Sequence, residues 1–198
     1  MPKLRLTKNE LKKQKDSLKM FKRYLPTLML KKQQLQSEIR IVELRANEVR
    51  LEKERVDESF KKWMAIFNET GIFTPDMLRI TSILTREGNI AGVPIPVFDG
   101  AEFEIAEYDL IETPLWLDLA VENMKKVLHL DLEVQILEEQ RRLLKKELQT
   151  TSQRVNLFEK IKIPEAKSNI KKIGVYLGDQ QTAAVVRGKI SKRGMEAG

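Results

Sequence analysis

The chain has 198 residues and a formal net charge of +7; charged residues make up 33% of it and aromatic residues 6%. That balance is poor for a thick globular core and usual for long amphipathic helices, so the length indicates one compact domain or one long helical rod. The sequence contains no cysteine, which excludes disulfides, thiol catalysis and cysteine zinc sites.

Charge is distributed in three blocks along the chain. Residues 1–62 carry 18 Lys/Arg and 9 Asp/Glu, residues 63–139 carry 4 and 15, and residues 140–198 carry 14 and 5, so the net charges are +9, −11 and +9. If the chain folds back on itself, both basic ends lie together, away from the acidic middle. This pattern fits solvated helix faces, or a polarised rod whose two ends meet different partners.

The N-terminal third has one unbroken apolar repeat. Steps of alternately three and four residues from Leu4 to Phe67 land on an apolar residue at 15 of 19 positions. Such a repeat predicts a coiled-coil seam, and a 64-residue helix would be about 95 Å long. We therefore predict a long helix over residues 1–70 that stops near Gly71. Because the seam keeps its register around Pro26, we expect a kinked continuous helix there, rather than two helices.

The residue pattern of 71–112 differs from that of the N-terminal third and predicts a short helix followed by a β-hairpin. Thr74 and Pro75 fit a helix start. Asp99-Gly100 lies between two alternating runs and predicts the hairpin turn, while a further strand near Thr81–Arg86 could pair across a turn at residues 87–89. We expect this insert to cap the helical pair at the end opposite the termini and to add little to its seam. Candidate partner-contact residues on the hairpin are Val93, Ile95, Val97, Phe103 and Ile105.

Two prolines predict the position in the sheet of the hairpin strand that contains them. Pro94 and Pro96 are on one side of it, and neither has an N–H to donate to a neighbouring strand. The strand is therefore predicted to be at a sheet edge.

The C-terminal part predicts a second long helix over residues 113–187 and a flexible tail over 188–198. Thr113 is a good N-cap and Pro114 fits the first helical position. The apolar stripe resumes beyond Pro164 about one residue out of phase, so we expect the proline to mark a register adjustment within a continuing helix. The predicted fold is mainly α: a long antiparallel two-helix coiled coil with a small β-hairpin insert. Its seam residues are Leu25, Leu28, Leu35, Ile39, Val42, Val49, Val56, Phe60, Val134, Leu137, Leu144, Leu148, Val155, Phe158, Ile170 and Ile173.

Residues for chemistry are few. His129 is the one histidine, and a lone helical histidine is more often a packing or surface residue than a catalyst. One histidine without cysteines cannot supply the usual ligands of a transition metal, and the stretch Arg86–Gly92 lacks the pattern of a phosphate-binding loop. We predict no catalytic residue, no metal site and no cofactor.

Two other classes share parts of this pattern. A nucleic-acid-binding scaffold would use the lysine-rich first helix to meet phosphates, but aromatic residues for base stacking are sparse and no reading motif is present. A basic coiled-coil tether would share the seam but has no need of the hairpin insert.

Three stretches carry a family resemblance: "LTKNELKKQKDSLKMFKRYLPTLMLKK" at the start, "NIAGVPIP" (89–96) in the insert and "RVNLFEKIKIPEAKSNI" (154–170) in the returning helix. Together they resemble the D subunit of the vacuolar/archaeal-type (V-type/A-type) rotary ATPases, over nearly the whole chain. Pro26 departs from the family's usual run.

The resemblance implies a central-stalk rotor that is not an enzyme by itself and that transmits torque between ATP turnover in a catalytic ring and proton or sodium transport through a membrane ring. The implied partners are the catalytic and regulatory subunits of the ATPase ring, the small F subunit of the stalk and the connector subunit of the membrane ring. No direct nucleic-acid binding and no membrane insertion are implied. The implied location is cytoplasmic, peripheral on the cytoplasmic face of the membrane.

Overall fold

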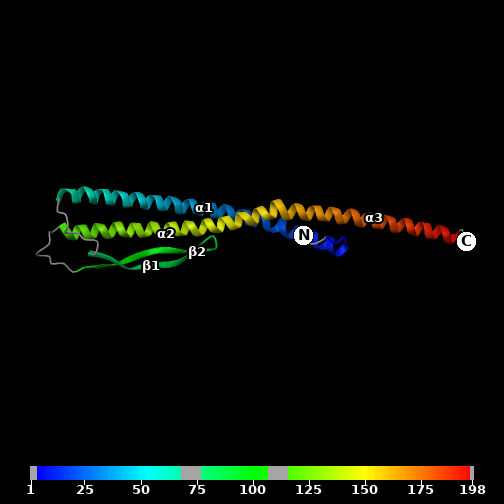
Figure 1. Ribbon diagram of the computed structural model, residues 1–198, viewed down its shortest axis with the longest axis horizontal. Helices are drawn as coiled ribbons and strands as arrows, with labels where there is room; N and C mark the ends of the chain where they lie inside the picture. The colour runs from blue at the N-terminus through cyan, green and yellow to red at the C-terminus, as the bar shows by residue number, and fades with distance from the viewer. Residues whose placement is uncertain (1–3, 68–76, 107–115, 197–198) are drawn as a thin grey trace. The chain divides into compact units, whose positions relative to one another are not determined.

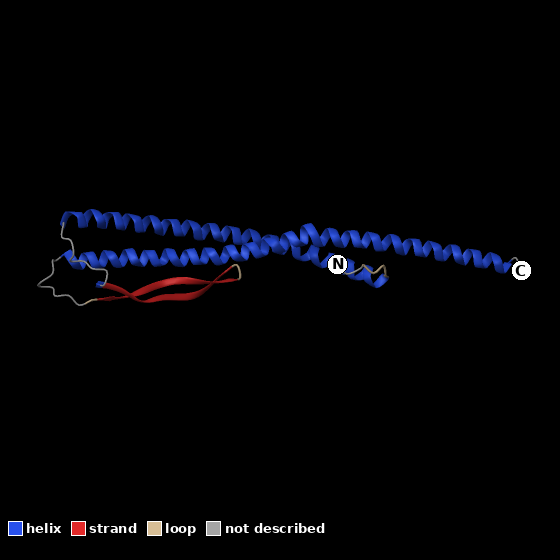
Figure 2. Ribbon diagram, viewed as in Figure 1, coloured by secondary structure: helices blue, strands red, loops and turns tan. Residues whose placement is uncertain are grey.

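The computed structural model describes residues 4–67, 77–106 and 116–196 (Figure 1). Its elements follow in the order α1 (Lys8–Phe67), β1 (Leu78–Ile90), β2 (Val93–Ile105), α2 (Trp116–Asn156), η2 (Leu157–Lys162) and α3 (Ile163–Glu196). Figure 2 shows that helix dominates and that the two strands form the hairpin between α1 and α2. The predicted fold class is confirmed: mainly α, with a β-hairpin inserted between long helices.

The chain divides into two compact units. One comprises residues 1–32 with 150–198, and the other comprises residues 33–149. In the second unit Glu43 pairs with Lys145 and Arg50 with Glu138, so later residues of α1 meet earlier residues of α2. The two helices of this unit are therefore antiparallel.

Helix α1 begins with a side-chain cap and continues past its internal proline. The Thr7 hydroxyl Oγ1 accepts a hydrogen bond from the Glu10 backbone N–H at 3.2 Å, which satisfies one of the unpaired donors of the first turn. Pro26 lies inside the helix and is exposed. The expectation of one continuous helix is confirmed, although an interior proline costs about 3 kcal/mol. The predicted stop at Gly71 lies outside the described residues.

The β-hairpin turns at a different place from the predicted one. Strands β1 and β2 are antiparallel, and the pair Ile90–Val93 closes a two-residue loop of Ala91 and Gly92. Their φ values of 52° and 78° are those of the mirror-image turn that matches strand twist. The Asn89 side-chain oxygen accepts the Gly92 N–H at 2.9 Å. The prediction of a turn at Asp99-Gly100 was wrong. The further strand expected near Thr81–Arg86 does pair with the strand that follows it, but the turn between them lies at residues 91–92 and not at 87–89.

Asp99 and Gly100 instead form an irregularity inside β2. Leu84 is opposite Gly100 and Thr85 is opposite Phe98, so Asp99 has no partner residue in the ladder. Such an extra residue is a β-bulge. Gly100 has φ 154°, and glycine adopts positive φ without steric cost. The Asp99 carboxylate pairs with Arg86 Nε at 3.0 Å across the strands.

The sheet has two strands in the described residues, so both are edge strands. The expectation of an edge position for the proline-containing strand is therefore confirmed. The proposed helix start at Thr74-Pro75 lies outside the described residues, and the chain is already in strand from Leu78.

The main core of the second unit joins both helices and the hairpin. Leu35, Ile39 and Val42 of α1 pack with Leu144 of α2 and with Val93 and Ile95 of β2, all buried. A smaller cluster joins Phe60 to Trp116, Leu117 and Ala120. The hairpin therefore packs along the helices and shares their core, because its tip carries the apolar side chains that complete it. The expectation that it would add little to the seam was wrong.

The returning helix contains one wide turn, Leu157–Lys162, hereafter the π turn. The Ile163 N–H donates to the Phe158 carbonyl, five residues back, so this turn holds about one residue more than an α turn. From Phe158 to Ala166 the stripe advances eight residues where a heptad advances seven. The extra residue in the wide turn restores the phase. The expected register adjustment is therefore present, but it lies just before Pro164 and not at the proline itself.

Helix α3 runs on to Glu196, beyond the predicted end of the helix at residue 187. Residues 188–196 are therefore helical, where a tail was predicted. Helix α2 is described from Trp116, and the predicted cap at Thr113 and Pro114 lies outside the described residues.

Candidate functional site

Every predicted seam residue is buried or half-buried in the structure. The most enclosed are Leu35, Val49, Leu144 and Ile173, each 0% exposed. In the first unit Phe21 of α1 meets Phe158 of the π turn, with ring centroids 5.1 Å apart. The buried members are Leu35, Ile39, Val42, Val49, Phe60, Val134, Leu144, Val155 and Ile173, and the half-buried ones are Leu25, Leu28, Val56, Leu137, Leu148, Phe158 and Ile170.

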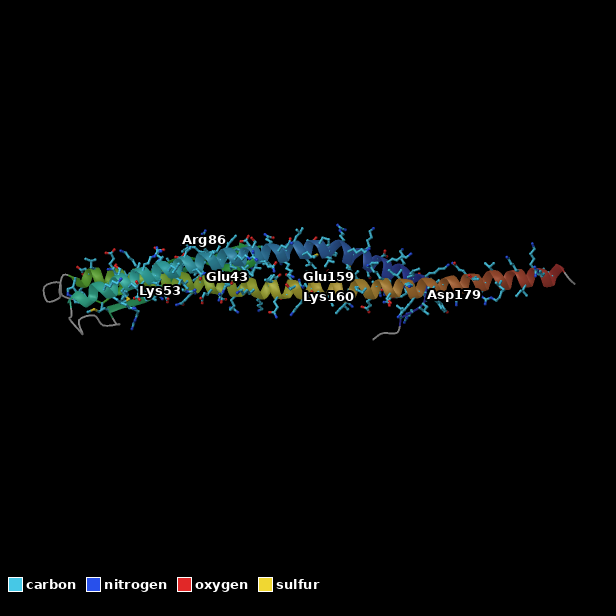
Figure 3. The ribbon with its side chains drawn as sticks, turned by 90° about the horizontal axis from the view of Figure 1, so that it is seen from above. Glu43, Lys53, Arg86, Glu159, Lys160 and Asp179 are labelled. Carbon is cyan, nitrogen blue, oxygen red and sulfur yellow. The ribbon has the colours of Figure 1, made fainter. Side chains whose placement is uncertain are left out.

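Among the described residues, four ion pairs from α1 to α2 lie beside the core of the second unit. Two of them form at 2.8 Å (Glu43–Lys145) and 2.7 Å (Arg50–Glu138). Figure 3 labels Glu43 and Lys53 on α1. Exposed pairs contribute about 0–1 kcal/mol each, so the buried seam supplies most of the stability. The pairs instead favour one axial register, because sliding the helices would separate all of them. The other two are Arg45–Glu133 and Lys53–Asp131.

These pairs shift the pKa values of their members. The hydrogen bond from Lys145 lowers the pKa of Glu43, and the hydrogen bond from Lys53 lowers the pKa of Asp131. The hydrogen bond to Glu133 raises the pKa of Arg45. All three shifts favour the charged form, as expected for groups that stabilise an ion pair.

Two side chains of α2 hold the hairpin in place. Gln140 is buried, and its Nε2 donates to the Pro96 carbonyl at 2.6 Å. About three helical turns earlier, His129 meets the Phe98 ring edge-on at 4.8 Å between centroids. His129 is thus a packing residue, as expected. The role of Gln140 was not predicted, because a glutamine on a charged helix has no apolar signature.

The predicted partner-contact residues of the hairpin are divided by this packing. Val93 and Ile95 are buried in the core shared with the helices, and Val97 packs against that core, so these three contact the chain's own helices. Phe103 is half-buried and Ile105 is exposed. Three apolar side chains that the hairpin does expose were not predicted: Ile80, Ile83 and Leu84 of β1.

Helix α1 carries an exposed apolar face that was not predicted either. Ile41, Leu44 and Leu51 are 56%, 64% and 53% exposed. Their spacings of three and seven place them on one side of the helix, at positions away from the seam where coiled coils usually carry polar residues. The signal was available in the sequence as apolar residues that the seam does not use. Exposed apolar groups of this kind often mark interaction surfaces.

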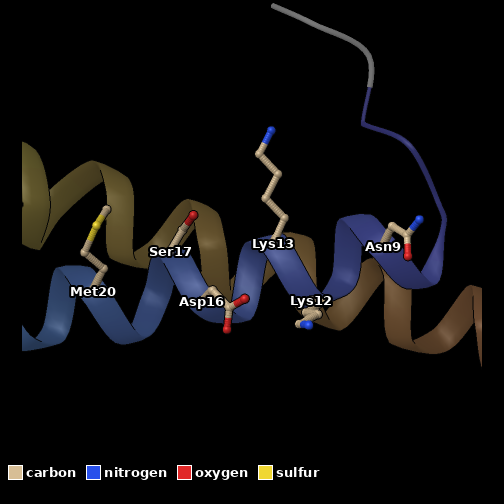
Figure 4. A pocket seen from close by; sticks show the side chains of 6 residues that line it. All are labelled: Asn9, Lys12, Lys13, Asp16, Ser17 and Met20. Atoms are coloured by element: carbon tan, nitrogen blue, oxygen red, sulfur yellow. The ribbon is translucent and has the colours of Figure 1, made fainter.

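The described surface has several hollows. One of about 470 Å³ is lined by residues of a single helix face near the start of α1, where Lys13 extends into the open (Figure 4). A site that binds a small molecule is normally enclosed on several sides. The residues that line the hollow near the start of α1 are Asn9, Lys12, Lys13, Asp16, Ser17 and Met20.

Metal ligands and membrane-spanning helices can be assessed for the described residues alone. Within them, His, Asp and Glu side chains nowhere gather in threes that could hold a metal ion. Among the same residues, every helix falls short of the length and apolar character that crossing a membrane requires.

Comparison with known proteins identifies the family. The family model of the ATP synthase D subunit matches residues 10–193. The chain is 53% identical over 192 residues to the D subunit of the V-type ATP synthase of Borreliella burgdorferi, covering 97% of this chain and 95% of that protein. It is 33% identical over 193 residues to the protein of the same name from Chlamydia muridarum, with 96% and 95% covered. The match to the Chlamydia pneumoniae protein is 32% over 201 residues, with 98% and 93% covered. A match over nearly the full length, with each helix and the hairpin included, means that this chain belongs to the family of ATP synthase D subunits.

Proposed function

We propose that this chain is the central rotor axle of a V-type ATP synthase or ATPase. In this role it transmits torque between ATP turnover in a ring of catalytic and regulatory subunits and proton or sodium movement through a membrane ring. The observation that carries the proposal is the antiparallel α1–α2 pair of the second unit, whose buried seam and cross-helix ion pairs hold one register.

Torque transmission requires that the two helices twist as one body. The core around Leu35 and Leu144 joins α1, α2 and the hairpin, and close-packed interiors transmit strain with little compression. The Gln140–Pro96 hydrogen bond ties the hairpin to the same body. The hairpin therefore stiffens the α1–α2 pair along which it packs.

The chain contributes no chemistry of its own in this proposal. Catalysis lies in the ring, and the axle acts on it by contacting the catalytic sites differently as it turns. A partner can shift a conformational equilibrium only through such differential contacts. The blocks of net charge +9, −11 and +9 along the sequence give the axle distinct ends with which to meet distinct partners.

Further subunits bind on the outer surfaces. The exposed α1 face of Ile41, Leu44 and Leu51 is a contact surface for a neighbouring subunit, for which the small F subunit of the stalk is the candidate. The connector subunit of the membrane ring is the partner at the end of the axle opposite the chain termini. The chain then lies at the cytoplasmic face of the membrane without entering it and binds no nucleic acid.

Reconstitution tests the proposal. The ring of catalytic and regulatory subunits is assembled with and without the chain, and steady-state ATP hydrolysis is measured for both samples and for the isolated chain. We expect sustained turnover only in the assembly that contains the chain, and no hydrolysis by the chain alone. Equal turnover of the ring without the chain would refute the proposed role.

A further inference from the structure

The π turn is an irregularity that a regular coiled coil does not contain. It precedes Pro164, which has no N–H to donate, and none of its six residues is buried. A helix with one residue fewer would keep the buried side chains Val155 and Ala166 in phase without a wide turn. Wide turns of this kind occur frequently at functional sites, and an observed backbone irregularity supports a hypothesis of function.

The outer side of the turn is apolar. Leu157 is 40% exposed and Ile161 is 54% exposed, while Phe158 faces inward to Phe21. Pro164 is exposed as well. Residues separated by three or four positions are neighbours on a helical surface, so Leu157, Ile161 and Pro164 form one small patch, hereafter the π patch.

The charges beside the π patch are mainly basic. Arg154, Lys160 and Lys167 are exposed and lie three or four positions from its members. An ion pair next to the patch, Lys162 with Glu165 at 3.4 Å, uses none of these three cations. Glu159 is the acidic group of the turn, and Figure 3 labels it beside Lys160. Three cations beside one carboxylate favour an acidic occupant.

We propose that the π patch is a contact surface for a protein segment that places apolar side chains on Leu157, Ile161 and Pro164 and acidic side chains on Arg154, Lys160 and Lys167. The inference rests on the proposed function, and this segment belongs to the ring of catalytic and regulatory subunits. The wide turn serves the contact by presenting Leu157 and Ile161 outward while Phe158 stays in the seam.

The experiment measures binding of the full-length chain to the reconstituted ring. The double variant L157Q/I161Q removes the apolar patch without touching a buried residue, and L30Q/L119Q changes two apolar residues that are also exposed (65% and 56%) but lie on α1 and α2 outside the π turn. We expect L157Q/I161Q to weaken ring binding at least tenfold at an unchanged melting temperature, and L30Q/L119Q to bind like the parent chain. The charge-reversal variant R154E/K160E should weaken binding more at low salt than at high salt.

The outcomes separate this inference from the proposed function. If the parent chain binds and activates the ring while L157Q/I161Q binds equally well, the π patch assignment is wrong and the axle remains. If the parent chain does not bind the ring, the proposed function itself fails. A photoreactive residue in place of Ile161 should cross-link to a ring subunit within an acidic segment. Binding of the parent chain to anionic phosphatidylglycerol vesicles that is lost in L157Q/I161Q, with ring binding retained, would overturn the assignment in favour of a lipid surface.

Discussion

Leu144 and Leu44 make a matched pair for testing the shared core. Leu144 is 0% exposed and packs in the cluster that joins α1, α2 and β2, whereas Leu44 is 64% exposed. Replacing a fully buried leucine with alanine costs about 2–5 kcal/mol, because it removes apolar contacts and leaves a cavity. We expect Leu144→Ala to cost about 3 kcal/mol, since three elements surround the site and cannot all collapse onto it.

The assay is equilibrium unfolding in urea, followed by circular dichroism. With an m value of about 2 kcal/mol/M, a loss of about 3 kcal/mol lowers the midpoint by about 1.5 M. Leu44→Ala should shift the free energy of unfolding by no more than about 0.5 kcal/mol. A double-mutant cycle of Leu144→Ala with Ile95→Ala should give a coupling energy of at least about 0.5 kcal/mol, because the two residues share the cluster. Equal midpoints for the two leucine variants, or no coupling to Ile95, would refute a core shared by helices and hairpin.

Three further predictions test local features. Asp131→Asn should make the free energy of unfolding depend less on pH in acid. The hydrogen bond from Lys53 lowers the pKa of Asp131 below its ordinary value of 3.8, so the stabilising contribution of Asp131 is present above that value and is lost as the pH falls. If urea unfolding at acid pH shows the same pH dependence for Asp131→Asn as for the parent chain, this reasoning is contradicted. Ala91→Gly should raise the free energy of unfolding by about 0.5 kcal/mol, because Ala91 has φ 52° and left-handed backbone is costly for residues with a Cβ. A lower free energy of unfolding for Ala91→Gly would contradict the left-handed conformation of Ala91 in the turn. Deleting Glu159 should convert the π turn into α-helix. The helical ellipticity and the melting temperature should be at least as high as those of the parent chain, since no residue of the turn is buried. A large fall in melting temperature would mean that the wide turn is needed for packing.

The long helices could be predicted because their signal repeats. Apolar residues recur every three or four positions of the sequence from Leu4 to Phe67, so single exceptions such as Lys53 do not hide the pattern. The same periodicity located the register adjustment, since the stripe skips one residue before Pro164. The form of the adjustment, a wide turn closed by Ile163 N–H on the Phe158 carbonyl, depends on backbone geometry that spacing alone does not specify.

The hairpin turn was misplaced because a strong local signal had another use. Asp-Gly is a common turn pair, but here Asp99 is the extra residue of a bulge and Gly100 supplies its positive φ. The real turn contains Ala91, a residue that rarely adopts left-handed backbone. Tertiary packing decided between the two, because a turn at residues 91–92 brings Val93 and Ile95 onto the helices.

The candidate contact surfaces were the least predictable part. Apolar residues such as Leu44 and Ile161 look the same in the sequence whether they are buried by the chain or exposed to a partner. Their exposure emerges only when the seam is assigned and the residues it does not use are counted. Val93 and Ile95 show the converse, since the internal core takes up side chains that were expected to meet a partner.

Direct observation of rotation tests the axle most directly. Because the sequence has no cysteine, a single Thr85→Cys on the exposed side of β1 gives one unique thiol to which a gold particle is attached. The catalytic ring is fixed to a surface and the labelled chain is assembled into it. We expect stepwise rotation of the particle in one direction when ATP is supplied, and no rotation without ATP. ATP hydrolysis that continues at full rate while the particle stays fixed would contradict it.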